Sequence, residues 1–347
     1  MKGRQIILDH VNGREAAALV VDGRLEDLLI DNDGPRPGAI YRAVADRPVK
    51  GQGGLFLRTP DGTAFLRQVK GIAPGDTMLV QITGHAEEGK ALPVTQKVLF
   101  KSRYAIVTPD APGLNISRSI RDDDLRDTLL GIAHEVMGDS PMGLILRSSC
   151  ETATPEEISE DIAAMADLAT AVLADAEGAA ECLTEGDGPH VLAWRDWVEP
   201  AEIITAEGSF ASHGVLEMIE ALRTPRVSLP GGSFAYIEPT RALVAVDVNT
   251  GADTSPAAAL KANIALARDL PRQLRLRGLG GQITLDLAPM PKKDRRAFEM
   301  AVKAAFRADS IETVMAGWTP LGHYELQRQR ARIALPVLLE EAGDDTL

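Results

Sequence analysis

The C-terminal third of the chain contains the pattern that most limits the possible folds, an apolar strand followed by a long helix and a second apolar strand. The first strand, Ala242 to Val246, ends at Asp247, and the helix is expected from about Pro256 to Arg277. A glycine-rich segment ends the helix, and the strand QITLDLA follows with Asp286 near its end. Because strands joined in this way are usually neighbours in one sheet, we expect Asp247 and Asp286 to lie close together.

These two aspartates follow apolar runs, LVAV before Asp247 and ITL before Asp286. A carboxylate in such a place must be paired, hydrogen-bonded or bound to a cation if it is buried. Two carboxylates facing Asn249 suit Mg²⁺, which takes one or two carboxylates and completes its shell with waters and phosphate oxygens. The alternative is structural, with Asp247 capping a turn and Asp286 paired with a local arginine. Spacing alone leaves both interpretations open.

The N-terminal region predicts strands, a joint and a small barrel. Residues 4–30 are interpreted as two strands around a turn at Asn12-Gly13, and the Pro/Gly-rich segment 31–38 as a domain boundary. Residues 39–99 contain short apolar runs at the spacing of an antiparallel barrel, which we interpret as an OB-type fold. Phe56 and Phe65 flank a turn in this region, with Lys90 on a later loop. Aromatic rings beside a cation suit stacking on unpaired bases, although both rings could instead belong to the barrel core.

The middle of the chain predicts a mixed α/β region. In residues 100–180, RYAIVTP and MGLILRSS are expected strands, and DDLRDTLLGIAHEVM and PEEISEDIAAMADLATAVLADA are expected helices. In residues 190–230, VLAWRDW and AEIITAEG are strand candidates and GVLEMIEALRT is a short helix.

The charge distribution decides which part of the chain can face an anion. The formal net charge is −13, which by itself argues against a polyanionic partner. From Glu151 to His190, however, there are 11 carboxylates and no Lys or Arg, whereas 11 basic residues stand against 4 acidic ones from Lys261 to Arg307. Arg272, Arg275 and Arg277 of this basic region are interpreted as ordinary surface charges or as contacts to a nucleic-acid backbone. The C-terminal third can therefore bind an anion.

Cysteine content and hydropathy predict the environment of the chain. Cys150 and Cys182 have no metal-ligand spacing, so we expect two buried thiols and neither a disulfide framework nor a self-contained zinc site. We find no apolar stretch long enough to cross a membrane and no signal-peptide core at the N-terminus, which predicts a cytoplasmic protein without a membrane partner.

The segments TRALVAVDVNTG and ANIALARDLPRQLRLRGLGGQITLDLAPM, with their unbroken spacing, resemble the catalytic region of the ribonuclease E/G family. Three earlier segments occur in the family's order: LNISRSI, MGLILRSSC and LPGGSFAYI. The resemblance covers roughly residues 1–335.

The resemblance implies a mixed α/β (α+β) chain of several subdomains. An RNase H-like subdomain would be interrupted by an OB-fold and a 5′-sensor region and followed by a DNase I-like catalytic subdomain. The expected ranges are 1–35 and 181–232 for the two RNase H-like parts, 36–99 for the OB-fold, 100–180 for the 5′-sensor subdomain and 233–340 for the catalytic subdomain.

The resemblance also implies an activity and its residues. The chain would be an Mg²⁺-dependent endoribonuclease that hydrolyses single-stranded RNA, such as ribosomal RNA precursors or messenger RNA, to 5′-phosphate and 3′-hydroxyl ends. The implied roles are as follows: metal binding by Asp247 and Asp286; orientation of a carboxylate or the scissile phosphate by Asn249; RNA contact by Phe56, Phe65 and Lys90; and 5′-phosphate sensing by Arg147, Ser148 and Arg118.

The sequence departs from the family pattern at three places. No Cys follows Cys182, so we expect no zinc-linked oligomer and a monomer or dimer instead. Pro289 stands where the family has a second acidic residue, and a basic residue of the family is replaced near Ile311 to Thr313. A non-cleaving RNA-binding paralogue is therefore the alternative to the endoribonuclease.

Overall fold

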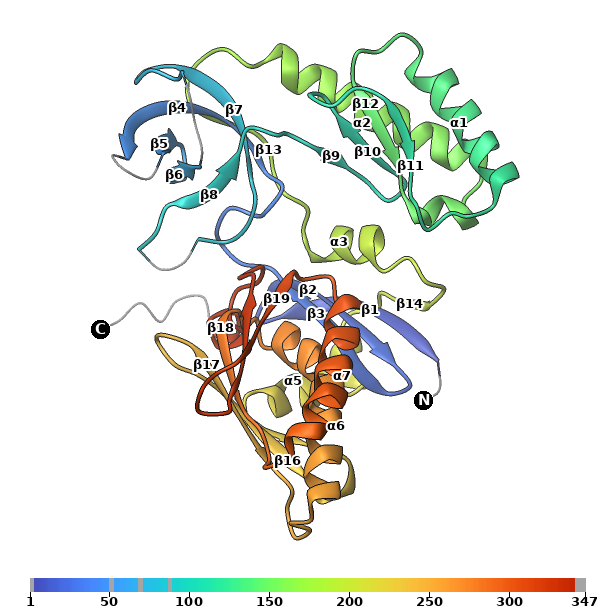
Figure 1. Cartoon of the computed structure of the whole chain (residues 1–347). Helices are drawn as coiled ribbons and strands as arrows, with labels where there is room; N and C mark the ends of the chain where they lie inside the picture. The colour runs from blue at the N-terminus through green and yellow to red at the C-terminus, as the bar shows by residue number, and fades with distance from the viewer. Residues whose placement is uncertain (1–2, 50–52, 68–70, 87–88, 341–347) are drawn as a thin grey trace. The chain divides into compact units, whose positions relative to one another are not determined.

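The computed structural model describes residues 3–49, 53–67, 71–86 and 89–340 (Figure 1). The chain forms two compact units. Unit 1 comprises Met1–Asp31 together with Ala201–Leu347, and unit 2 comprises Asn32–Pro200. Unit 1 is thus built from two distant parts of the sequence.

The first sheet of unit 1 is formed by three N-terminal strands and one strand from the second part of the unit. Its order is β14-β1-β2-β3, with β1 and β14 parallel and the other pairs antiparallel. The strands are β1 (Arg4–Val11), β2 (Arg14–Val21), β3 (Arg24–Ile30) and β14 (Glu202–Ile204). The prediction of two strands in this region is wrong, because Asp22-Gly23 makes a second tight turn like that at Asn12-Gly13. All four turn residues have positive φ, which suits the turns that connect twisted hairpins.

The second sheet of unit 1 has six strands in the order β15-β16-β17-β18-β20-β19. The strands are β15 (Arg226–Ser228), β16 (Phe234–Pro239), β17 (Val244–Asn249), β18 (Gly281–Asp286), β19 (Thr313–Trp318) and β20 (Tyr324–Arg328). As the sequence predicts, β17 and β18 are parallel neighbours joined through a long helix, α6 (Pro256–Leu276).

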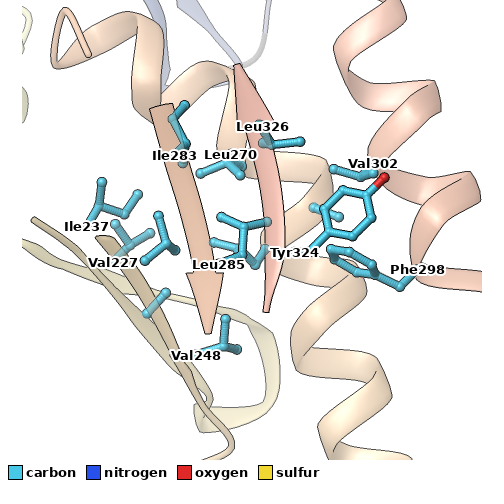
Figure 2. Packing of buried hydrophobic residues seen from close by; sticks show 14 of the residues in the cluster. Val227, Ile237, Val248, Leu270, Ile283, Leu285, Phe298, Val302, Tyr324 and Leu326 are labelled. Carbon is cyan, nitrogen blue, oxygen red and sulfur yellow. The ribbon is translucent and has the colours of Figure 1, made fainter. Parts of the chain in front are cut away.

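One face of this sheet is covered and the other is open. Alternate residues of each strand, such as Val246, Leu285 and Leu326, pack with α6 and with α7 (Arg295–Arg307). Figure 2 shows Phe298 and Val302 of α7 beside Tyr324 of β20 in this core. The residues between them in sequence therefore point to the uncovered face.

Short helices complete unit 1. The first sheet packs with residues such as Phe210, Val215 and Ile219, and with Leu276 of α6. The short helices that pack on this sheet are α4 (Ser209–Ser212), α5 (Val215–Leu222) and α8 (Leu335–Leu339).

A chain of ion pairs links five segments of unit 1. Asp27 of β3 contacts Arg332 at 2.5 Å and Arg275 of α6 at 3.4 Å. Arg275 also pairs with Asp309, whose other oxygen lies 2.7 Å from Arg328 Nη1. The side chains of Asp309 and Arg328 are 1% and 0% exposed. The interpretation of Arg275 as a surface charge is therefore wrong, and Arg277 is buried as well.

Unit 2 begins with a barrel that confirms the predicted OB-like closure. Five strands pair in the order β4-β5-β6-β8-β7, and β7 pairs back with β4. The strands are β4 (Ile40–Val49), β5 (Gly54–Thr59), β6 (Gly62–Leu66), β7 (Thr77–Ile82) and β8 (Leu92–Thr95), with β13 (Glu181–Thr184) added at β4.

The rest of unit 2 is a small α/β layer. Its sheet order is β11-β12-β10-β9, and two helices share its core. The elements are β9 (Phe100–Lys101), β10 (Ala105–Thr108), β11 (Leu114–Ile116), α1 (Asp123–Met137), β12 (Gly143–Leu146) and α2 (Pro155–Ala174).

The strand expected at VLAWRDW is wrong, because this segment lies in helix α3 (Pro189–Asp196). Pro189 occupies the first helical turn, where its fixed φ and missing N–H are tolerated. The buried residues are Pro189, Ala193 and Trp197, which recur at intervals of four, as on one face of a helix. In the described part of the chain, no helix is long and apolar enough to cross a membrane.

Candidate active site

Two carboxylates lie side by side on the open face of the six-stranded sheet. Asp247 of β17 and Asp286 of β18 are partners in the parallel register. Both residues are exposed, because the apolar partners on either side of each point to the core. The sequence argument from costly burial is therefore wrong here, although the two carboxylates are adjacent as expected.

Each carboxylate has a neighbour on the same face. The amide of Asn249 donates from Nδ2 to Asp247 Oδ2 at 2.9 Å. His323, directly before β20, places Nδ1 3.3 Å from Asp286 Oδ1. Asp286 therefore lies against a histidine, and among the described residues no arginine forms an ion pair with it, unlike in the structural alternative.

Further side chains extend this site into a row across the sheet. Arg226 of β15 is the register partner of Tyr236 on β16, and Tyr236 is the partner of Asp247. Phe234, the partner of Asn249, meets Tyr236 edge-on with ring centroids 5.7 Å apart, and the Arg226 guanidinium lies 4.5 Å from the Phe234 centroid. We call Arg226, Tyr236, Asp247, Asp286 and His323 the acidic-site row.

The carboxylate oxygens of Asp247 and Asp286 determine which metal ion this site would suit. Asp247 and Asp286 supply hard carboxylate oxygens, and both carboxylates remain open to solvent. In the described ranges, no group of three or more His, Cys, Asp and Glu residues is arranged to hold a metal ion. Two carboxylates with the remaining positions left to water and phosphate correspond to the way proteins bind Mg²⁺. A closed tetrahedral zinc site needs four protein ligands.

An aromatic pair marks the outer face of the barrel. Phe56 of β5 and Phe65 of β6 are register partners with ring centroids 5.4 Å apart. Their sequence neighbours Leu55, Leu57 and Leu66 are buried inside the barrel, whereas both rings are only partly buried. The two rings therefore do not belong to the barrel core.

One cation lies beside the aromatic pair, and a second lies near the turn of the hairpin that carries it. The Arg47 guanidinium lies 5.5 Å from the Phe56 centroid. Lys90 is exposed and precedes Leu92, the strand partner of Ala64, so it lies toward the hairpin turn of Thr59–Gly62. Arg47 was not among the residues selected from the sequence.

The proposed phosphate-sensing residues lie at the ends of two parallel strands, β11 and β12. Arg147 donates from Nη1 to the backbone oxygens of Ser102 and Arg195 at 2.6 and 3.2 Å, and from Nη2 to Asp196 at 2.8 Å. Ser148 and Arg118 are exposed. Arg147 is therefore held by a carboxylate that a phosphate would have to displace.

Burial alone would raise the pKa of the Asp196 carboxyl. The adjacent guanidinium groups of Arg195 and Arg147 more than offset this and hold the pKa below its usual range. Asp196 is therefore ionised at neutral pH and competes for Arg147.

The model of the Ribonuclease E/G family matches residues 100–202 and 195–331, together more than half of the chain. The chain belongs to the ribonuclease E/G family. The acidic-site row and Arg147 both fall inside the matched ranges.

Similar proteins in this ribonuclease E/G family include ribonuclease E of Nostoc sp., 27% identical over 94% of this chain and 56% of the relative. Ribonuclease E of Synechocystis sp. is 26% identical over 94% of this chain and 57% of its own length. Ribonuclease G of Salmonella typhimurium is 25% identical over 94% of this chain and 80% of its own length. The chain thus spans a little over half the length of these two ribonucleases E.

Three residues of the row in this ribonuclease E/G family member were missed from the sequence, Arg226, Tyr236 and His323. A signal for Tyr236 was present, because it alternates with core positions in the expected hairpin SFAYIEP. His323 enters the site only through the antiparallel pairing of β20 with β18, in which Leu285 faces Tyr324. Sequence spacing does not indicate such a long-range pairing.

Proposed function

We propose that this chain is an Mg²⁺-dependent endoribonuclease that hydrolyses single-stranded RNA and leaves 5′-phosphate and 3′-hydroxyl ends. One observation carries the proposal, the register pairing of Asp247 with Asp286 on an exposed sheet face. The similar proteins are ribonucleases E and G, which supports RNA as the substrate.

Asp247 and Asp286 would hold the metal through their open carboxylate oxygens. When bound, Mg²⁺ would supply Lewis-acid chemistry, stabilising negative charge on a phosphodiester and favouring ionisation of water. Asn249 holds the Asp247 carboxylate through its amide, and His323 lies against that of Asp286. These contacts limit carboxylate rotation, so less orientational freedom is lost when the metal and substrate bind.

The subdomain identities belong to the same proposal. The first sheet of unit 1, with α4 and α5, would be the RNase H-like part, and the six-stranded sheet with α6 and α7 would be the DNase I-like catalytic part. The closed barrel would be the OB-type RNA-binding part.

Phe56 and Phe65 would stack on unpaired bases of the substrate, with Lys90 near its backbone. Both rings stand on the outer face of the barrel beside Arg47. Stacked bases in a duplex do not offer their faces, so this surface favours single strands.

We expect Phe56→Ala and Phe65→Ala each to weaken RNA binding by about 5- to 150-fold, because stacking contributes about 1–3 kcal/mol per base. Fluorescence anisotropy with a labelled single-stranded RNA in EDTA measures the loss without cleavage. Phe56→Tyr should retain affinity, and Thr63→Ala on the same outward face serves as the matched control. Equal affinity of the alanine variants and this control would remove the pair from the RNA site.

Arg147, Ser148 and Arg118 would contact a 5′-terminal phosphate. The Arg147 guanidinium has a planar fork that suits a phosphate, and its present carboxylate partner Asp196 would be exchanged for it. This exchange explains how an arginine already in an ion pair can still serve as a sensor.

The deciding experiment is cleavage of a 5′-monophosphorylated, fluorescent single-stranded RNA in Mg²⁺ and in EDTA. We expect internal cuts that need Mg²⁺ and that carry 5′-phosphate ends. The double variant Asp247→Asn/Asp286→Asn, prepared in parallel, shows whether a contaminating nuclease is responsible.

The outcomes separate the two functions of different class. Metal-dependent cuts that disappear in the double variant support the endoribonuclease. RNA binding without any cleavage by the unchanged chain would instead identify a non-cleaving RNA-binding paralogue.

A further inference from the structure

A large cavity lies in unit 1 at the β15 edge of the six-stranded sheet, beside α6, α5 and the start of β3. Its volume is about 1030 Å³. Part of its wall is apolar, with Met218, Leu222 and Leu276 among the lining residues. A space of this size holds a ligand as large as a nucleotide.

The charged lining of this cavity is strongly basic. Among the lining residues there are five arginines and one carboxylate: Arg24, Arg226, Arg268, Arg272, Arg277 and Asp269. Asp269 is already shared by Arg24, by Arg272 at 2.7 Å and by Gln273 at 2.8 Å. One carboxylate cannot neutralise five guanidinium groups, so the cavity attracts an anion.

Arg277 is the buried member of this set, with 7% of its surface exposed. Its guanidinium donates to Gln273 Oε1 and, at 3.2 Å, to the backbone oxygen of Thr224, both of which are neutral acceptors. Burial and the neighbouring charge of Arg272 lower the pKa of Arg277 to about 10, so it remains a cation at neutral pH. A buried cation held by neutral oxygens favours an anionic ligand nearby.

Arg226 joins this cavity to the acidic-site row. It lines the cavity and is also the register partner of Tyr236, which is the partner of Asp247. Neighbouring strands are about 4.8 Å apart, so Arg226 lies only about 10 Å along the sheet from Asp247. A short length of nucleic-acid backbone that starts at the two carboxylates on the open face can cross Tyr236, pass around the edge strand β15 and enter the cavity on the side of α6.

We propose that the arginine-lined cavity binds nucleotide phosphate, and that the source is the RNA strand flanking the cleavage position. The proposal rests on the proposed function for its substrate. The arginines contact backbone phosphates, and the apolar wall at Met218 and Leu222 takes up sugar or base surface.

The test compares RNA binding by two double variants of the full chain in EDTA. Arg226→Gln/Arg268→Gln changes the cavity, and Arg241→Gln/Arg307→Gln makes the same change of charge at exposed sites outside the cavity lining. Neither Arg226 nor Arg268 forms an ion pair with any residue that the structure describes, so the cavity variant should fold normally. Circular dichroism checks this for both proteins.

We expect the cavity variant to bind a short single-stranded RNA more weakly than the control variant. The slope of log affinity against log salt should fall by about 1.4, since each lost phosphate contact accounts for about 0.7 on a single strand. In Mg²⁺, KM should also rise, because the variant loses contacts to the bound RNA strand.

Two other results would overturn the proposal. Equal RNA affinity and equal salt slopes for the two variants would reject the cavity as an RNA site, while metal-dependent cleavage by the same proteins would leave the proposed function intact. AMP and pyrophosphate binding is measured with the same two variants. If the cavity variant binds these small molecules more weakly while its RNA affinity is unaffected, the cavity would be assigned to a free nucleotide. Weakened RNA binding without cleavage by any variant would support the cavity and count against the nuclease.

Discussion

An Asp286→Asn variant is expected to cleave RNA at least about a thousandfold more slowly than the unchanged chain. Asparagine preserves the shape of the side chain but removes one of the two negative charges that would hold the metal. A loss of about 4 kcal/mol of transition-state stabilisation corresponds to this factor in kcat. Single-turnover cleavage in Mg²⁺ measures the effect, and Asp247→Asn should behave in the same way.

The matched control for this prediction is Glu238→Gln. Glu238 is an exposed carboxylate on the same sheet face, two residues beyond Tyr236 along β16. The Glu238→Gln variant removes the same charge outside the acidic-site row, so its cleavage rate should stay close to that of the unchanged chain. RNA affinity in EDTA should not fall in any of the three variants. If Asp286→Asn lowers the cleavage rate less than tenfold, the metal is bound elsewhere and the proposed site is wrong.

Asp309→Ala is expected to lower the free energy of unfolding of unit 1 by about 3–5 kcal/mol. The variant leaves two guanidinium groups, those of Arg275 and Arg328, without their shared buried carboxylate. A domain is typically stable by about 5–15 kcal/mol, so this loss is a large fraction of the total.

Urea unfolding, followed by the fluorescence of Trp318, measures this loss of stability in unit 1. The other two tryptophans, Trp194 and Trp197, lie in unit 2 and are replaced by Phe in both proteins. Glu220→Ala is the control, because its ion pair with Arg223 is solvent-exposed and contributes about 0–1 kcal/mol. Equal stability of the two variants would show that the ion-pair chain does not stabilise unit 1.

The same ion-pair chain gives the pH dependence of unit 1. Burial would raise the pKa of the Asp27 carboxyl, but Arg332 and Arg275 offset this and hold the pKa below its usual range. A depressed pKa contributes stability above the unfolded value of about 3.9, and that stability is lost as the pH falls through the folded value. Unfolding measured from pH 6 to pH 3 should therefore show a steep loss of stability that is smaller in an Asp27→Asn variant.

The parts of the fold that could be predicted are those with local signals. Helix α6 follows a serine that caps it and ends before a glycine-rich segment, so its limits and the two flanking strands were predictable. The adjacency of Asp247 and Asp286 followed from that unit. The barrel was predictable from the regular spacing of its turns.

The errors came from positions where tertiary context decides. VLAWRDW has a composition suited to a strand, yet Ala193 and Trp197 are buried at helical spacing. The helix arginines look like surface charges in sequence, whereas Arg275 is fixed by partners more than 200 residues away in β3. His323 joins the site through strand pairing of the same non-local kind. No window of sequence contains such information.

The division of unit 1 between the two ends of the sequence has a consequence for synthesis on the ribosome. Unit 2 is continuous, so its barrel and α/β layer can fold as soon as they emerge. Strands β1 to β3 emerge first, but their core partners Phe210, Val215 and Leu276 come about 200 residues later. At about 5–20 residues per second, the apolar faces of the first two hairpins stay uncovered for roughly 10–40 seconds. During that interval the nascent chain offers these strands to chaperones, and unit 1 is completed after unit 2.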